Sequence, residues 1–98
     1  MEAISNMLKV VKISEIAPYY IVCDLNNGIK KRLEILPLIE AHKRFEGIES
    51  LKDKEFFASG SIGELGEIYW KNLITLNNKH WDYDISPEFI FQNGETIA

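Results

Sequence analysis

The sequence has very little cysteine and no long apolar segment. Cys23 is the only cysteine, so no internal disulfide can form, and a lone thiol suits a reducing compartment. The longest unbroken apolar run, Ile16–Cys23, has eight residues and contains Pro18, whereas a membrane-spanning helix needs about 20. Residues 1–6 have neither the positive charge nor the apolar stretch of a signal peptide. We therefore expect a cytoplasmic protein without a membrane partner.

The chain also lacks an excess of basic residues. Its net charge is −4, and the excess of acid lies in residues 61–98, which hold two basic and six acidic residues. Proteins that bind nucleic acid need a basic surface against the phosphates. General nucleic-acid binding is thus not expected. Lys30, Lys31 and Arg32 form the one basic stretch that could contact nucleic acid or an acidic partner, and a solvated sheet face explains them as well.

Motifs for catalysis, metals or nucleotides are missing too. Gly60, Gly63 and Gly66 match neither the spacing of a phosphate loop nor that of a dinucleotide loop. His42 and His80 are the only histidines, and neither has a second His or Cys at the spacing of a zinc site. The sequence therefore predicts no cofactor, no metal and no catalytic residue.

The residues that are present predict one small α+β domain. Its 98 residues suffice for a single domain, which we place at 7–98, after a flexible extension at 1–6. Residues 7–16, 19–25 and 29–36 have the composition and alternation of strands. Asn27-Gly28 predicts a tight turn that joins the second and third strands into a hairpin.

Helix signals follow the hairpin. Pro37 suits the first position of a helix that Gly47 would end, and a second short helix fits Leu51–Phe57 with Ser50 or Asp53 as its cap. Ser86-Pro87-Glu88 starts a third, which Gly94 would end. Residues 67–70 and 73–76 are further strand candidates. The predicted fold is a small antiparallel sheet with a β-hairpin and two or three short helices packed on one face.

Two groups of residues near the C-terminus are candidates for binding a partner. Trp70, Trp81 and Tyr83 would form an interaction surface if exposed and would anchor the core if buried. Asp82 and Asp84 precede the helix start at Ser86 and could supply oxygen ligands, although acids near a helix start are favourable without any ligand. With Lys30 and Arg32, these five residues are the candidate partner-binding set.

The order of signals along the chain resembles a known family. Leu36-Pro37-Leu38, Gly66-Glu67-Ile68-Tyr69-Trp70 and Asp84-Ile85-Ser86-Pro87-Glu88-Phe89 are similar to segments of the small bacterial family called domain of unknown function 2442. The resemblance spans about residues 7–92, and residues 71–83 depart from the pattern of many members. It implies a compact α+β fold, no established activity or cofactor, and a role like that of toxin–antitoxin proteins.

Two hypotheses about function follow. The first is a non-enzymatic interaction or regulatory module that binds another small protein or a copy of itself. The second is a small hydrolase or ligand-binding enzyme that uses His80, Asp82 and Asp84. A buried pocket uniting those three side chains would favour the enzyme, whereas a flat apolar patch would favour the interaction module.

Overall fold

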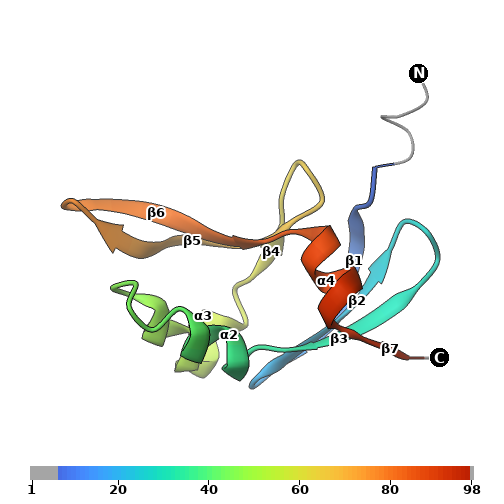
Figure 1. Cartoon of the computed structure of the whole chain (residues 1–98), viewed down its shortest axis with the longest axis horizontal. Coiled ribbons are helices and arrows are strands. Elements are labelled where there is room, and N and C mark those ends of the chain that lie inside the picture. The colour runs from blue at the N-terminus through green and yellow to red at the C-terminus, as the bar shows by residue number, and fades with distance from the viewer. Residues whose placement is uncertain (1–6, 98) are drawn as a thin grey trace.

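The strands form two antiparallel sheets. In the computed structural model, which describes residues 7–97, the larger sheet has the strand order β1-β2-β3-β7 and the smaller has β4-β5-β6 (Figure 1). The larger sheet consists of β1 (Val10–Ala17), β2 (Tyr20–Leu25), β3 (Lys30–Glu34) and β7 (Glu95–Ile97). The smaller sheet consists of β4 (Ser61–Ile62), β5 (Ile68–Leu76) and β6 (Lys79–Ile85).

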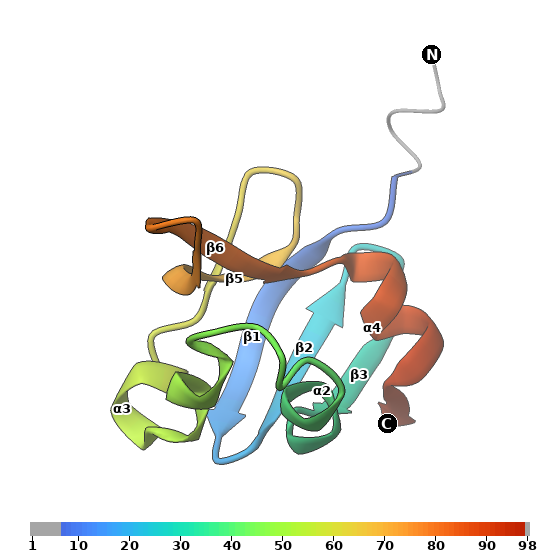
Figure 2. The same ribbon diagram turned by 60° about the vertical axis from the view of Figure 1, so that its left-hand side comes forward.

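Short helices lie between and after these strands. They are α2 (Leu36–Ala41), the 3-10 helix η1 (Ile48–Lys52), α3 (Lys54–Phe57) and α4 (Pro87–Asn93). Figure 2 shows α2 and α4 in front of the sheet formed by β1, β2 and β3, and α3 beside its β1 edge. The predicted small α+β class with antiparallel strands and a few short helices is confirmed.

The first hairpin closes through the three residues 26–28, which lie between the two strands that the sequence predicts. Gly28 has a positive φ of 87°, but Asn27 does not, and the N–H of Gly28 donates to the carbonyl of Leu25 at 3.0 Å. The N–H of Leu25 in turn donates to the carbonyl of Ile29 at 2.9 Å. This is a three-residue hairpin loop, in which only the last residue needs the left-handed conformation. The hairpin expected from the Asn27-Gly28 signal is therefore present, and Gly28 supplies its positive φ.

Helix starts agree better with the sequence than helix ends. The side chain of Asp53 caps α3 by accepting from the N–H groups of Glu55 and Phe56, and Ser86 caps α4 by accepting from the N–H of Phe89. The helix from Pro37, however, ends at Ala41 instead of reaching Gly47. The chain leaves the helix there, and the carbonyl of Glu46 accepts a hydrogen bond from the N–H of Thr75 in β5.

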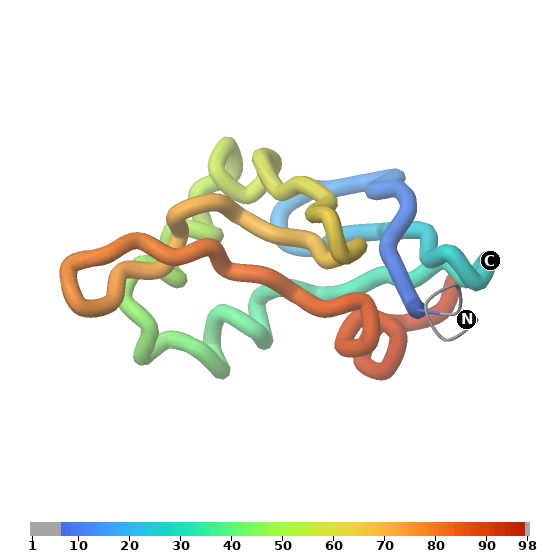
Figure 3. The backbone as a smooth tube through the Cα atoms, turned by 90° about the horizontal axis from the view of Figure 1, so that it is seen from above, coloured from blue at the N-terminus to red at the C-terminus, as the bar shows by residue number. Residues whose placement is uncertain are grey.

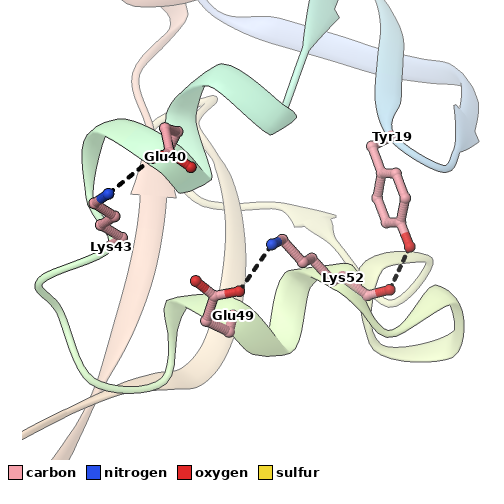
Figure 4. Close-up of polar contacts among 5 residues, drawn as sticks. All are labelled: Tyr19, Glu40, Lys43, Glu49 and Lys52. Atoms are coloured by element: carbon pink, nitrogen blue, oxygen red, sulfur yellow. Dashed lines mark hydrogen bonds and ion pairs between the residues drawn. The ribbon is translucent and has the colours of Figure 1, made fainter.

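One hydrophobic core joins both sheets and the helices. Its largest fully buried side chains are Trp70 and Phe57. Ile21, Cys23 and Leu25 point into it from β2, as their alternation predicts. The segment with η1 and α3 is held against the larger sheet by Tyr19, whose hydroxyl donates to the carbonyl of Lys52 (Figure 4).

The predicted flexible extension at 1–6 lies outside the described residues. Across residues 7–97, none of the helices is long and apolar enough to cross a membrane.

Candidate functional site

The β5–β6 hairpin extends from the body of the molecule (Figure 1). Its turn is Asn77-Asn78, and both residues have positive φ angles, 55° and 63°. This is the geometry of a two-residue hairpin turn, and asparagine is one of the few residues besides glycine that tolerates it. Because β5 and β6 are antiparallel, residues directly opposite each other share a face of the hairpin.

One face of the hairpin changes from buried to exposed along its length. Trp70 pairs with Tyr83 near the body, and Ile74 pairs with Trp81 farther out. Trp70 is fully buried, Tyr83 is half-buried and Trp81 is 52% exposed. Leu76, which lies beside the turn, is 54% exposed. We call the exposed Leu76 and Trp81, with the half-buried Ile74, the tip patch.

The three aromatic candidates therefore have different roles. The indole N–H of Trp70 donates to the carbonyl of Phe57 at 2.9 Å, and its ring stacks on that of Phe57 at 5.8 Å. Trp70 is thus a core anchor, and the surface role that would follow from exposure does not apply to it. Tyr83 lies at the margin of the core, and Trp81 is accessible to a partner.

Tyr83 makes the most specific polar contact of the site. Its hydroxyl lies 3.0 Å from Nδ1 of His42, which immediately follows α2. Burial, with a smaller contribution from the charge of Asp84, raises the pKa of Tyr83 to about 12. The phenol is therefore neutral near pH 7. The contact joins the residue that follows α2 to β6.

A depression of about 250 Å³ opens beside this contact. We call it the α2–β6 pocket, and it is lined by Leu38, His42, Tyr83, Asp84, Ile85, Ser86 and Phe89. Leu38, Ile85 and Phe89 give it an apolar lining. Figure 3 shows α2 on the side of β6 that faces away from β5. The pocket thus lies below the outer edge of the hairpin, between α2 and α4.

The opposite face of β6 is polar and open. His80, Asp82 and Asp84 are all exposed and follow each other at alternate positions. Asp82 accepts from the N–H of Asn72 at 3.0 Å, where the register of β5 shifts. A second depression, of about 450 Å³, is bordered by Asp82 and Asp84 together with Glu64, Glu67 and Lys71, and His80 is not part of its lining. The enzyme hypothesis, which needs the three side chains around a buried pocket, gains no support from this arrangement.

Two of the three basic candidates pair with neighbouring acids. Lys30 forms an ion pair with Asp24 at 3.3 Å, and Nε of Arg32 donates to Glu34 at 2.8 Å. Lys31 points to the other face, is only 7% exposed and donates to the carbonyl of Gly94 at 3.2 Å. The three cations therefore do not form one continuous basic surface, which the nucleic-acid hypothesis requires.

Reactive and metal-binding side chains are sparse in the described part of the chain. Cys23 is buried in the core, and burial raises the pKa of its thiol to about 11, so that the nucleophilic thiolate is not formed near pH 7. Over residues 7–97, no group of three or more His, Cys, Asp or Glu side chains is placed to hold a metal ion.

Sequence reasoning missed β6 itself and the pairing of His42 with Tyr83. The sequence indicated a polar stretch at residues 77–80 and a strand end or loop at residues 82–88, because polar residues alternate here with Trp81 and Tyr83. The signal that could have revealed the strand is Asn77-Asn78, a pair that suits a two-residue hairpin turn. No local signal connects His42 with Tyr83, because 41 positions separate them.

Comparison with known proteins leaves the family open: no family model, no curated protein and no solved structure matches the chain. The resemblance to domain of unknown function 2442 stays a prediction.

Proposed function

We propose that the chain is a non-enzymatic interaction module that binds another small protein through the β5–β6 hairpin. The observation that carries this proposal is the exposure of Trp81 and Leu76 on a projecting hairpin. Tryptophan is enriched among residues that dominate binding energies. A regulatory role of the toxin–antitoxin type is the finer form of the proposal, and it rests on the family resemblance.

The surroundings of the tip patch suit a protein partner. The exposed Lys79 pairs with Leu76 and shares its face of the hairpin, while the exposed His80 and Asp82 lie on the other face of the same strand. An apolar centre with a polar rim is the usual composition of a protein–protein interface. The patch holds few apolar residues, so we expect a modest interface and a reversible complex.

The direct test is a comparison of three tagged proteins in a lysate of the cells that encode the chain. These are the parent, the double variant Leu76→Ser/Trp81→Ser, and the control Val11→Ser. Val11 is 58% exposed and lies on β1 of the other sheet, so the control removes an exposed apolar side chain elsewhere. A protein retained by the parent and the control but lost with the double variant supports the proposal.

The retained protein is then purified and titrated against the same three proteins. Equal affinity for the parent and the double variant, with both folded by circular dichroism, would show that the hairpin is not the binding surface.

A further inference from the structure

We propose that β6 accepts an extended segment of a partner protein as an added strand, and that this segment alternates basic with apolar side chains. The inference rests on the proposed interaction function and specifies how the partner binds and what chemistry it carries. Three observations support it: an open strand edge, an apolar pocket below that edge, and acids on the strand's outer face.

The first observation is that β6 ends its sheet. The strand order is β4-β5-β6, and among residues 7–97 no other strand pairs with the outer side of β6. In an antiparallel pair, successive residues direct their N–H and C=O groups alternately toward the partner strand and away from it. A strand of seven residues with one unpaired side is a template for another strand.

The pairing of β5 shows which residues of β6 face outward. Thr75 donates its N–H away from β6, to the carbonyl of Glu46, and Thr75 lies opposite His80. The carbonyl of Glu67 likewise accepts from Gly63, on the side of β5 away from β6. His80, Asp82 and Asp84 therefore present their main-chain groups to the open side. We call these three residues the open edge.

The second observation is the α2–β6 pocket directly below the open edge. An added strand would place alternate side chains on the face that Tyr83 and Ile85 share, which is the face toward this pocket. A volume of about 250 Å³ with the apolar lining of Leu38, Ile85 and Phe89 accommodates one large apolar side chain. In strand addition, main-chain hydrogen bonds supply affinity and such pockets supply specificity.

The third observation is the charge on the outer face. The remaining side chains of an added strand would lie beside those of Asp82 and Asp84, and residues 61–98 hold six acids against two bases. Opposite charges on neighbouring strands are favourable, and like charges are not. The partner strand is therefore expected to carry Lys or Arg at alternate positions.

The same charges disfavour a second copy of the chain at this edge. If two β6 strands paired about Asp82, each Asp82 would face its counterpart, an unfavourable arrangement. The chain's own basic strand, β3, is already paired on both sides, with β2 and β7. The occupant is thus a segment of another protein.

The experiment uses a fluorescein-labelled peptide of seven residues that alternates lysine and leucine, with both ends blocked. Binding to the whole protein is followed by fluorescence anisotropy. We expect saturable binding that weakens by about tenfold or more when glutamate replaces lysine, or when N-methylation of alternate residues removes the hydrogen-bond donors. A peptide with alanine at the central leucine is expected to bind several-fold more weakly, because it leaves the pocket unfilled.

Two pairs of protein variants locate the site. His80→Pro removes the outward N–H of His80, while His80→Ala removes only its side chain, so binding should fall about tenfold with proline and change little with alanine. Asp84→Asn should weaken the lysine peptide, whereas Glu95→Gln, the same charge change on β7 of the other sheet, should not. Circular dichroism checks that each variant is folded.

The outcomes separate this inference from the proposed function. If His80→Pro and the N-methylated peptide bind like their parents, strand addition is overturned, while a partner lost with the tip-patch variant still supports the interaction module. Absence of any peptide binding also overturns strand addition. A dimer in analytical ultracentrifugation that His80→Pro abolishes would assign the edge to a second copy and overturn the occupant proposed here. If all captured proteins are independent of the hairpin, the proposed function itself fails.

Discussion

Trp70 and Phe57 are joined twice, by ring stacking at 5.8 Å and by the hydrogen bond from the Trp70 indole to the carbonyl of Phe57. The pair connects β5 with the end of α3, and both side chains are fully buried. The contact therefore ties the smaller sheet to the helical segment. Its hydrogen bond is made in the interior, where water cannot replace a lost partner.

Trp70→Phe tests this bond while keeping an aromatic ring. The carbonyl of Phe57 would lose its donor, and an unsatisfied buried acceptor costs about 1–3 kcal/mol. Some loss of packing adds to this cost, because phenylalanine is smaller. Denaturant unfolding of both proteins measures the difference, and a change below about 0.5 kcal/mol would show that the bond does not contribute.

Gly28 and Gly47 both have positive φ, but their surroundings differ. An added Cβ at Gly28 would meet nothing within 4 Å, whereas at Gly47 it would collide with the carbonyl oxygen of Leu73. Gly28→Ala should therefore cost about 1–2 kcal/mol, the penalty of the left-handed conformation alone. Gly47→Ala should cost about 3 kcal/mol or more, because a steric clash adds to the same penalty. Equal losses in thermal unfolding would contradict the structure at Gly47.

The Asn77-Asn78 turn predicts a contrast between two substitutions of one residue. Asn78→Gly keeps the positive φ accessible and should change the free energy of unfolding by less than about 0.5 kcal/mol. Asn78→Val should cost about 1–2 kcal/mol, because a β-branched side chain resists this conformation. Chemical denaturation measures both. A well-tolerated valine would mean that the strands are joined by a looser turn.

Cys23 predicts how stability depends on alkaline pH. Burial raises the pKa of its thiol from 9.0 to about 11, so the folded state binds this proton more tightly than the unfolded chain. The resulting stabilisation is complete below pH 9 and is lost as the pH rises through about 11. In this window the free energy of unfolding of the parent should fall with pH more steeply than that of Cys23→Ala. The difference between the two slopes should reach up to about 1.4 kcal/mol per pH unit.

The measurement is urea unfolding at several values between pH 8 and pH 10, and slopes are compared because Cys23→Ala also loses packing. Tyr83, whose pKa is raised to about 12, adds a further decline above pH 10 in both proteins. Parallel slopes in the two proteins would show that the thiol of Cys23 ionises as readily in the folded state as in the unfolded chain.

Local chemistry explains why some elements could be predicted from the sequence. Ser86-Pro87 and Asp53 act through hydrogen bonds and backbone angles within a few residues. Ser86 caps α4 as predicted, and Asp53 is the one of the two candidates, Ser50 and Asp53, that caps α3. β5 was expected as two pieces because Lys71 and Asn72 interrupt its apolar alternation. In the structure the strand continues through a register shift between Trp70 and Ile74, which Asp82 supports from the neighbouring strand.

The candidate site depends on contacts that no local pattern reveals. The α2–β6 pocket combines Leu38 and His42 with Tyr83 and Phe89, from segments that meet only through the fold. Whether an aromatic residue is a core anchor or part of a surface also depends on the fold. Trp70 and Trp81 occupy the same face of one hairpin, and only their distance from the body makes one buried and the other exposed.

The charged outer face of β6 also has a consequence for solubility. An unpaired strand edge invites association between copies during folding and storage, and charges on such an edge oppose it. Asp82 and Asp84 would then act as gatekeepers against aggregation. Replacing both carboxylates with apolar residues should convert the open edge into a nucleation point for oligomers. The feature proposed to admit one correct partner would then be the feature that keeps identical chains apart.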